Sequence, residues 1–590
     1  MKIRSKLGFF VTYFLIIVLF CFVLYRVFDI QIARSNEYIY NAKQAYIYSY
    51  VLYPLRGKIY DRYGKVLADN QLKYRIFVYS KDVDKINDEI VKLANIFGNY
   101  VFEKYRDSID YLNRNPYIDK IYILDDLEYD ERLHRFEIEF SNNPVINYEE
   151  YYKRVYLYPN ISHVLGYIGY ADDNQIKTGK YQHGDYGGKT GIEYQFEDIL
   201  SGQKGKASRF YSYVEREYFD TIISQPKNGS DVYLTIDVDL QNYIYQVIEQ
   251  VLKTKYYTNA ISISVVVKDL KTGDLLAIVS VPTFDSNLFV DGISLEKYDE
   301  YLQNPGKPLI NKPFQYAQNP GSTFKIFIDY LLLANKIVDP NEFIETGGVF
   351  RYKDIEFVDY NRINWGRINM SRAICVSSNI YHMRGVLQWQ ENSDQDIATT
   401  IAHLADKSEI TQIDAGLFGT INGYFPYPEG EKQMNRTWLP GELLNAVIGQ
   451  GKNQITPLGA VNLVSLIANN GVYVKSRLII DKNSNTNVNQ YQIIGPIDTD
   501  PIYEGMKCTT ESSARTVGGY PKDYPLYYSK TGTAETGRLS DGKEIIHGWE
   551  VSFGPIDDPK YAISVFVENG RLGNHASLIS REIYKYLRDK

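Results

Sequence analysis

An apolar run at the start of the chain constrains its fold more than any other feature. Three of the first six residues are basic, and residues 7–25 follow without a single charge. At about 1.5 Å of rise per residue, a helix of this length crosses the ~30 Å hydrocarbon core of a membrane. Residues 26–29 offer no small-residue site of the kind that ends a cleaved signal. We therefore expect residues 1–6 in the cytoplasm, an uncleaved signal anchor over 7–25, and the remainder outside the membrane.

The rest of the chain has the size and composition of a folded protein. Its 590 residues predict two or more domains, and 44% hydrophobic with 23% charged residues fits a globular protein. A net charge of −7 without a block of lysine or arginine argues against nucleic acid as a partner. Three cysteines do not make a disulfide framework. We expect Cys375 and Cys508 to be buried structural thiols and Cys21 to lie in the anchor.

Hydrophobic patterns and turn residues predict the order of the elements. Residues 38–50 are expected as a helix or strand that leaves the membrane, 56–68 as a hairpin, and 154–170 as a strand pair. A domain boundary is expected at 227–229, after which Asp237 is a plausible N-cap. Within 228–590 helices are expected from 320 to 475 and over 577–587, and strands over 261–268, 275–281, 526–535, 549–554 and 561–567. A sheet built from both ends of a domain, with helices inserted between, indicates an α/β (α+β) sandwich.

Ser322 and Lys325 form a Ser-x-x-Lys tetrad that predicts a nucleophilic serine activated by a lysine. Pro320-Gly321 precede it, and an apolar run expected to be helical follows it to Ala334. On a helix the lysine lies on the same face as the serine and can take its proton when its amine is neutral. Burial of the lysine stem favours the neutral amine. A helix N-terminus also favours a developing oxyanion at the serine.

Four other Ser-x-x-Lys tetrads show that the pattern alone has little meaning. They begin at Ser201, Ser224, Ser294 and Ser540. The first contains a glycine, the second a proline that disfavours helix, and the last reads as a turn. Ser294 can open a helix, but its surroundings are polar. Only Ser322 begins a long apolar helix.

Two further motifs accompany Ser322. Lys530, Thr531 and Gly532 lie in a strand-like segment, where Lys530 with Thr531 or Thr533 can hold a carboxylate while the glycine lets a substrate backbone approach. An earlier Lys-Thr-Gly at Lys189 precedes a helix and is set aside. Ser377 and Asn379 form a Ser-x-Asn, in which the hydroxyl can relay a proton and the amide can bind a peptide group.

The order Ser-x-x-Lys, Ser-x-Asn, Lys-Thr-Gly is the set known from penicillin-recognising serine enzymes. Segments 56–68, 163–167, 191–193 and 438–457 also match the class B penicillin-binding proteins, the D,D-transpeptidases of bacterial cell-wall synthesis. The chain therefore resembles this family over nearly its whole length. The resemblance implies a penicillin-binding transpeptidase fold for 228–590, with an antiparallel sheet flanked by helices, and an elongated mixed non-catalytic pedestal over 26–227.

Residues 284–294 resemble the elongation type of this family rather than the division type. The resemblance implies a role in cell elongation and shape, and a single-pass protein of the inner membrane. The implied partners are peptidoglycan stem peptides, lipid-linked precursor strands, β-lactam antibiotics, a SEDS-family glycan polymerase and elongation-complex proteins. No cofactor is expected. Some relatives hold zinc before the second motif. Asp354, Asp359 and Cys375 lie in that region here, but Arg367 stands where a histidine would help, and we expect no metal.

The resemblance gives each site residue a role. Lys325 takes the Ser322 proton, Ser322 attacks the penultimate D-alanine carbonyl, and the N–H groups of Ser322 and Thr533 stabilise the oxyanion. Ser377 protonates the leaving D-alanine. Asn379 holds the peptide, and Lys530, Thr531, Gly532 and Thr533 form the binding strand for the terminal carboxylate.

Three alternatives remain at this stage. A β-lactamase or D,D-carboxypeptidase shares the motifs but rarely has an anchor and a pedestal. A division-type transpeptidase is separable by its location in the cell. A catalytically dispensable scaffold that activates a glycan polymerase would tolerate loss of Ser322.

Overall fold

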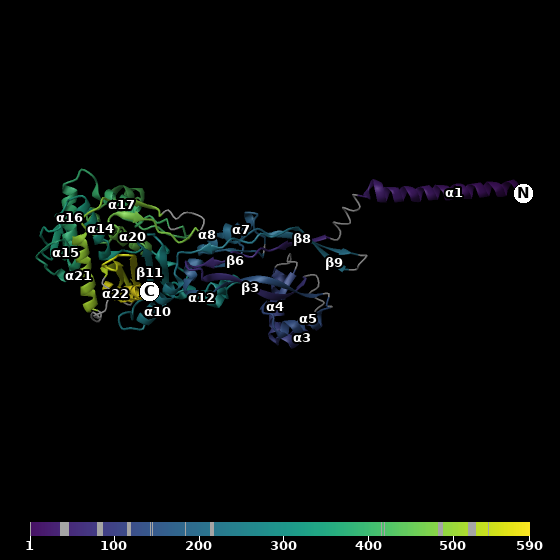
Figure 1. Ribbon diagram of the computed structural model, residues 1–590, viewed down its shortest axis with the longest axis horizontal. Coiled ribbons are helices and arrows are strands. Elements are labelled where there is room, and N and C mark those ends of the chain that lie inside the picture. Colours follow the sequence, from purple (N-terminus) through teal and green to yellow (C-terminus); the bar gives the residue numbers. More distant parts are fainter. Residues whose placement is uncertain are drawn as a thin grey trace. The chain divides into compact units, whose positions relative to one another are not determined.

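The computed structural model of the protein describes residues 2–35, 47–79, 87–114, 120–141, 143, 145–182, 184–212, 217–414, 416–417, 419–439, 441–481, 488–516, 527–540 and 542–590 (Figure 1). The chain divides into two compact units. One consists of residues 1–56 and 201–230, and the other of 57–200 and 231–590.

The first unit combines the predicted anchor helix with a small sheet. Helix α1 (Lys2–Phe28) continues into a π-helical turn, η1 (Asp29–Ala33). Residues 8–33 are long and apolar enough to cross a membrane, and the apolar side chains from Phe9 to Phe28 are exposed, as a lipid-facing helix requires. Strands β1 (Ile47–Leu52), β8 (Gly205–Ser212) and β9 (Glu217–Ser224) pair antiparallel in the order β1-β8-β9. The predicted segment 38–50 lies outside the described residues up to 46, and its last four residues belong to β1.

In the second unit, residues 57–200 together with residues 232–233 form a mixed sheet with helices against it. The sheet contains β10 (Val232–Tyr233), β2 (Ile59–Tyr60), β3 (Val66–Tyr79) and β4 (Lys120–Leu127) in that order, and β5 (Ile146–Tyr156) pairs with β3. Apolar side chains of α3 (Asn87–Phe97), α4 (Tyr100–Arg114) and α5 (Glu131–Phe140) share a core with β3 and β4. The predicted hairpin is confirmed: β2 and β3 are antiparallel, and the Asp61 carboxylate accepts from the turn N–H groups of Tyr63 and Lys65.

The prediction of a strand pair over 154–170 is wrong. Strand β5 ends at Tyr156, and a 3₁₀ turn and helix α6 (Ser162–Leu165) follow. The next strand, β6 (Ile168–Tyr170), pairs with β7 (Tyr186–Gly188) rather than with β5. The apolar residues of α6 are buried because the turn packs inside the unit, and a short buried turn has the same apolar pattern as a short buried strand.

A buried ion pair joins the segments on which the pedestal resemblance rests. Arg154 and Glu193 are 1% and 0% exposed, and Arg154 Nε lies 2.7 Å from Glu193 Oε1. Arg154 also donates to the Gly57 carbonyl oxygen at 2.8 Å. Glu193 lies in α8 (Gly191–Gln195), which precedes α9 (Glu197–Leu200). The guanidinium therefore links β5, the start of the hairpin and α8 at one point.

Residues 231–590 are built on a five-stranded antiparallel sheet. Its order is β12 (Leu275–Val281), β11 (Ser262–Asp269), β21 (Tyr561–Glu568), β20 (Lys543–Gly554) and β19 (Tyr528–Ser540). The predicted strands are confirmed, although β19 and β20 extend into a longer hairpin than the polar sequence around 536–543 suggested. Strand β19 lies at the edge of the sheet, as expected for the strand with Lys530.

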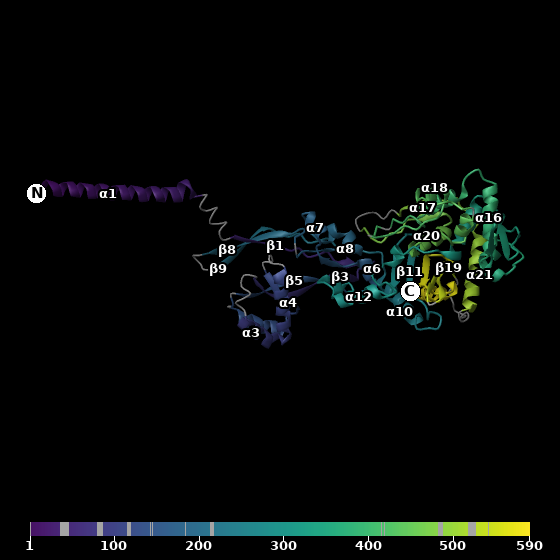
Figure 2. The ribbon, with the colours of Figure 1, turned by 180° about the vertical axis from the view of Figure 1, so that it is seen from behind.

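Helices cover both faces of this sheet (Figure 2). Alternate β21 side chains face opposite ways: Ile563, Val565 and Val567 pack with α10 (Val238–Val251) and α22 (Gly573–Asp589), whereas Ala562 and Phe566 pack with the inserted helices. Asp237 is the N-cap of α10, as predicted, and accepts from Asp239 N and Leu240 N. Helix α20 (Pro457–Ala468) is apolar on all sides and buried over most of its length, so it is the central helix on the inserted side.

The remaining elements of this part are short or lie around the inserted helices. The helices are α11 (Asn287–Val290), α12 (Leu295–Gln303), α13 (Lys312–Gln315), α14 (Lys325–Ala334), α15 (Met370–Val376), α16 (Asn379–Glu391), α17 (Ile397–Lys407), α18 (Pro428–Gln433), α19 (Glu442–Val447) and α21 (Asp500–Thr516). The strands are β13 (Ile344–Glu345), β14 (Val349–Tyr352), β15 (Ile355–Val358), β16 (Arg367–Ile368), β17 (Val472–Val474) and β18 (Gln490–Gln492). Residues 321–323 form the 3₁₀ turn η4 directly before α14.

Candidate active site

Ser322 lies in η4, where the backbones of three segments approach one another closely. Gly321 has a φ of +55° and its N–H donates to the Gly449 carbonyl oxygen at 2.9 Å. A Cβ on Gly449 would lie 2.0 Å from the Gly321 oxygen, and one on Gly321 would lie 2.6 Å from the Thr533 oxygen. Only glycine fits at these two positions. The turn that presents the half-buried Ser322 is therefore held between β19 and the loop after α19.

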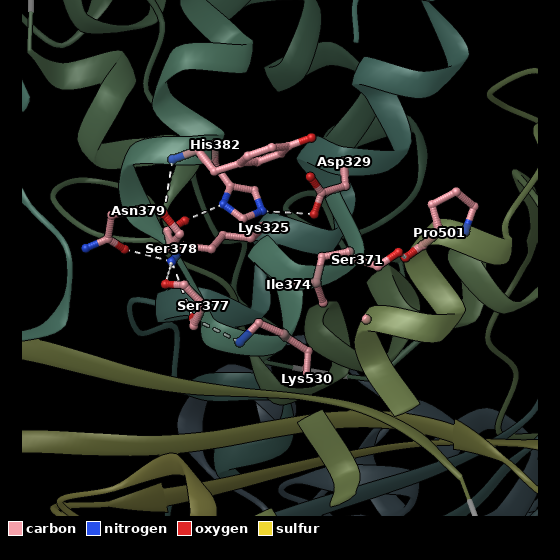
Figure 3. Close-up of polar contacts among 12 residues, drawn as sticks. Lys325, Asp329, Ser371, Ile374, Ser377, Ser378, Asn379, His382, Pro501 and Lys530 are labelled. Atoms are coloured by element: carbon pink, nitrogen blue, oxygen red, sulfur yellow. Dashed lines mark hydrogen bonds and ion pairs between the residues drawn. The ribbon is translucent and has the colours of Figure 1, made fainter. Parts of the chain in front are cut away.

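Lys325 is the first residue of α14, and its side chain is fully buried. Its amino group donates to the Ser377 carbonyl oxygen at 2.8 Å and to Asn379 Oδ1 at 2.7 Å, and it lies 3.4 Å from Ser377 Oγ (Figure 3). Burial lowers the pKa of Lys325 well below its usual value, and the positive charge of Lys530 lowers it further. The predicted burial of Lys325 is confirmed. The structure records no hydrogen bond between the Ser322 hydroxyl and a described residue.

Ser377, which Lys325 contacts, also accepts a hydrogen bond from a second lysine, Lys530. Ser377 ends α15 in a left-handed conformation, with φ 57° and ψ 41°. Lys530 is 1% exposed, and its Nζ donates to Ser377 Oγ at 3.1 Å and to the Thr531 carbonyl oxygen at 2.8 Å. Burial lowers the pKa of Lys530 to about 7. Two lysines with lowered pKa values thus approach one serine hydroxyl.

Asp359 fixes the segment that contains the Ser-x-Asn motif, and the sequence did not suggest this role. The carboxylate follows β15 and accepts from Ser378 Oγ at 2.9 Å, from Asn379 N, and from Ile380 N at 3.1 Å. The Asn379 amide also donates to the Val358 carbonyl oxygen at 2.8 Å. A carboxylate that receives the free N–H groups at a helix start acts as a cap. Because this cap comes from a distant loop, no local capping pattern could have revealed it.

Strand β19 contains the predicted binding residues and lies at the edge of the sheet formed by the described strands. Thr531 and Thr533 are half-buried, and the Thr533 hydroxyl accepts from Gly573 N at 3.4 Å. Gln450 donates to the Thr533 carbonyl oxygen at 3.1 Å. A Cβ on Gly532 would lie 2.7 Å from the Pro320 oxygen, so this glycine allows β19 to reach the turn that contains Ser322. An extended peptide can add to such an edge through main-chain hydrogen bonds.

The other Ser-x-x-Lys tetrads belong to other elements of the chain. The Ser294 hydroxyl accepts from Lys297 N and is the N-cap of α12, as its helix-opening position suggested. Ser540 and Lys543 are cross-strand partners at the end of the β19–β20 hairpin. Ser201 and Ser224 belong to the other compact unit.

The prediction that Cys375 and Cys508 are buried thiols is wrong, whereas Cys21 lies in the long apolar helix α1, as expected. Cys375 and Cys508 are half-buried and form a disulfide with a Cα–Cα distance of 5.3 Å, and Cys21 is free. The pairing joins α15 to α21, and a separation of 133 residues gave the sequence no means of identifying it. With its sulfur in this bond, Cys375 does not offer a thiolate to zinc. Within the described residues no group of three histidine, cysteine, aspartate or glutamate side chains is arranged to hold a metal ion.

Comparisons with known proteins agree with this geometry. The model of the penicillin binding protein transpeptidase domain matches residues 263–587, and that of the penicillin-binding protein dimerisation domain matches residues 51–234. The peptidoglycan D,D-transpeptidase MrdA of Haemophilus influenzae is 27% identical over 95% of this chain and 88% of its own length. MrdA of Escherichia coli K12 is 26% identical over 95% and 91%.

Solved structures give the same fold. The penicillin-binding protein PBP2 of Helicobacter pylori, in a complex with MreC, superposes with a TM-score of 0.75 at 24% identity over 92% of this chain and 99% of its own. PBP2 of Pseudomonas aeruginosa, in complex with WCK 5153, gives a TM-score of 0.67 at 23% identity over 92% and 96%. The two family models together span most of the chain, and the transpeptidase model alone matches more than half of it. The chain therefore belongs to the penicillin-binding proteins with a transpeptidase domain.

Proposed function

We propose that this protein is a peptidoglycan D,D-transpeptidase of cell elongation and that Ser322 is its nucleophile. The observation that supports this best is the convergence of Lys325 and Lys530 on Ser377 beside the Ser322 turn. Three motifs that are far apart in the sequence meet in one polar site. A buried pair of amines with lowered pKa values is suited to activate a hydroxyl and to relay its proton.

Burial and the positive charge of Lys530 favour a neutral Lys325 as the base, and its contacts are compatible with that state. A neutral amine has two N–H groups and one lone pair. The two shortest contacts of the Lys325 nitrogen are a carbonyl oxygen and an amide oxygen, which can only accept. In a neutral amine these contacts use both N–H groups and leave the lone pair for a hydroxyl proton. The lowered pKa of Lys325 also increases the fraction of Lys325 that is neutral and able to accept a proton.

The reaction follows from these roles. Lys325 takes the hydroxyl proton as Ser322 Oγ bonds to the carbonyl carbon of the penultimate D-alanine. The backbone N–H groups of Ser322 and Thr533 stabilise the oxyanion. The C–N bond then breaks, Ser377 gives its proton to the leaving D-alanine nitrogen, and Lys325 returns a proton to Ser377. The amine of a second stem peptide then attacks the ester carbonyl carbon and forms the cross-link amide. The ester C–O bond breaks, and a proton from the amine passes through Lys325 to Ser322 Oγ, which frees the serine.

The binding strand holds the donor peptide in this scheme. Lys530, Thr531 and Thr533 bind the terminal carboxylate, and Gly532 allows the peptide backbone to approach β19. Asn379 binds the peptide group next to the scissile bond. A β-lactam places its carboxylate on the same residues and acylates the same serine, but its ester persists.

The setting of the enzyme is the outer face of the inner membrane. Helix α1 spans the bilayer once, with residues 1–6 in the cytoplasm and residues 26–227 as the pedestal of the transpeptidase domain over 228–590. The partner is a SEDS-family glycan polymerase with other elongation proteins, which supplies lipid-linked precursor strands. The solved complex of PBP2 with MreC and a solved peptidoglycan synthase complex, both similar to this chain in fold, support a partnered enzyme.

Labelling with a fluorescent penicillin tests the assignment. The full-length protein in detergent is expected to gain the mass of one penicillin, and the labelled peptide is expected to contain Ser322. Ser322→Ala should abolish labelling. Ser294→Ala, from an identical-looking tetrad, should label as the wild type does. Labelling of Ser322→Ala, or an unlabelled wild type that binds no penicillin, would remove Ser322 as the nucleophile.

A further inference from the structure

A buried carboxylate and imidazole lie between the two catalytic helices, and the reaction scheme uses neither of them. Asp329 is on α14 and His382 on α16, and both side chains are 0% exposed. His382 Nε2 lies 2.9 Å from Asp329 Oδ2. Figure 3 shows the imidazole between the Asp329 carboxylate and Ser378, next to Lys325.

Hydrogen-bond chemistry fixes how many protons this pair holds. His382 Nδ1 contacts the Ser378 carbonyl oxygen, which can only accept, so Nδ1 bears a hydrogen. Nε2 faces a carboxylate oxygen, and this contact also needs a proton. A neutral imidazole has only one N–H. The pair therefore holds one more proton than a neutral histidine and an ionised carboxylate would hold together. With this proton the pair has no net charge.

The position of the pair ties it to the catalytic residues. Asp329 lies one helical turn after Lys325, and His382 one turn after Ser378, so the contact joins the two helices one turn behind their catalytic ends. The second carboxylate oxygen, Asp329 Oδ1, is buried without a hydrogen-bond partner among the described residues. An unneutralised carboxylate at this place would be costly, and the imidazole proton prevents that.

Several charged groups act on the two lysines. Lys325 is influenced by Lys530 from β19, by Asp359 from the loop after β15 and by Asp329 from its own helix. Both carboxylates oppose the lowering of the Lys325 pKa, and Asp329 does the same for Lys530. Tyr381, beside His382 on α16, is also near Asp329, and burial raises its pKa before the carboxylate raises it further. The charge on Asp329 is thus felt at both lysines.

We propose that Asp329 and His382 are a positioning pair for acyl transfer: they hold the helix of Lys325 against the helix of the Ser-x-Asn motif, and their shared proton sets the charge that faces the two lysines. This inference rests on the proposed role of Lys325 as the base. Neither residue touches the substrate. Their effect reaches the reaction through the proton affinity of Lys325.

Three variants separate this role from simple packing. His382→Gln leaves the Asp329 carboxylate without a counter-charge, which raises the pKa of Lys325. Acylation needs neutral Lys325, so the acid limb of the pH–rate profile should move up by about 1 pH unit. Asp329→Asn removes the carboxylate together with the shared proton, and its amide can donate to Nε2 of a neutral imidazole. The pair stays uncharged, so its acid limb should stay close to that of the wild type. The double variant should return close to the wild-type profile.

The measurement is the rate of acylation by a fluorescent penicillin between pH 5 and 9 on full-length protein in detergent, with thermal melting of each variant. His163→Gln is the matched control, because His163 is also buried and contacts a backbone carbonyl, that of Pro308, outside the site. It should lower the melting temperature without moving the acid limb.

An upward shift in His382→Gln that is absent from Asp329→Asn and cancelled in the double variant supports the proposal. An unmoved acid limb in His382→Gln would overturn it, even with a lowered melting temperature, since that result is what packing alone predicts. If His382→Gln does not fold, the double variant decides: a folded double variant with a wild-type acid limb supports the shared charge, and a double variant that also fails to fold contradicts it. A failure of the Ser322 assignment would appear instead as labelling of Ser322→Ala, so the two outcomes are distinct.

Discussion

Lys325 and Lys530 reach the same hydroxyl from opposite sides, with nitrogens 3.4 Å and 3.1 Å from Ser377 Oγ. Two ammonium ions in a buried site repel each other, and each also loses hydration. The arrangement therefore favours a single positive charge on the two lysines together, with Lys325 neutral and Lys530 charged. The two lysines titrate as a coupled pair.

The pH profile of acylation should be bell-shaped. Below the lowered pKa of Lys325 the base is protonated, so the rate falls with falling pH. Above the pKa of Lys530, about 7, the residue that binds the carboxylate loses its charge, so the rate falls again. Lys530→Arg keeps its charge at all these pH values and should remove the high-pH limb, at a lower maximal rate. A high-pH limb that persists in Lys530→Arg would assign that limb to another group. Stopped-flow acylation with a fluorogenic cephalosporin measures both limbs.

Asp359→Ala should impair acylation more than its effect on stability suggests. The change leaves Ser378 Oγ, Asn379 N and Ile380 N without their acceptor, a cost of about 1–3 kcal/mol. Displacement of the Ser-x-Asn segment by about 1 Å would reduce acylation on the order of 10²-fold. Asp396→Ala, which removes the N-cap of α17, is the matched control. It should lower the melting temperature but change the acylation rate by no more than about two-fold from the wild type. That change is far smaller than the loss expected from a displaced Ser-x-Asn segment. Equal acylation rates in the two variants would exclude a positioning role for Asp359.

Because Cys375 and Cys508 form a disulfide, we expect one free thiol in the unreduced protein. Alkylation of the denatured, unreduced protein should modify one cysteine, Cys21, and prior reduction should expose three. Paired Cys375→Ser and Cys508→Ser changes should lower the free energy of unfolding by about 2–4 kcal/mol, because the bond closes a long loop. Cys21→Ser should leave stability unchanged. Three alkylated cysteines without reduction would show that the bond does not form.

Gly449→Ala should disrupt the nucleophile turn. Its Cβ would lie 2.0 Å from the Gly321 carbonyl oxygen, so the loop or the turn must move. We expect at least ~10²-fold slower labelling of Ser322 by penicillin. Gly366→Ala is the control, since Gly366 has a similar φ of +68° but no atom within 4 Å of an added Cβ. If both variants label equally slowly, backbone strain and not the close approach explains the effect.

The sequence revealed the site through residues whose chemistry is local. Ser322 was distinguished by the apolar helix that follows it, and Lys530 by the strand-like segment around it. The structure places Lys530 on an edge strand and buries Lys325, as predicted. Asp237 was correctly predicted as an N-cap because its hydrogen bonds reach only to Asp239 and Leu240. Such patterns depend on neighbours within one turn or one strand.

The sequence failed where a contact joins distant segments. The 154–170 region was misread because buried turns and buried strands share an apolar pattern. The Cys375–Cys508 bond, the Asp359 cap and the Asp329–His382 contact all pair residues on different elements. None of these residues has a neighbouring pattern that differs from an ordinary surface or core position.

By itself, therefore, the sequence determined an anchored protein with a serine, two lysines and an asparagine in a chemically meaningful order. Only the tertiary structure decided that both lysines meet at Ser377, which carboxylates face them, and which covalent bond holds α15 to α21. The physical reason is that proton affinity depends on burial and on charges within a few ångströms. Those neighbours are set by how helices α14, α15 and α16 pack against the edge strand β19, and a linear pattern does not contain that packing.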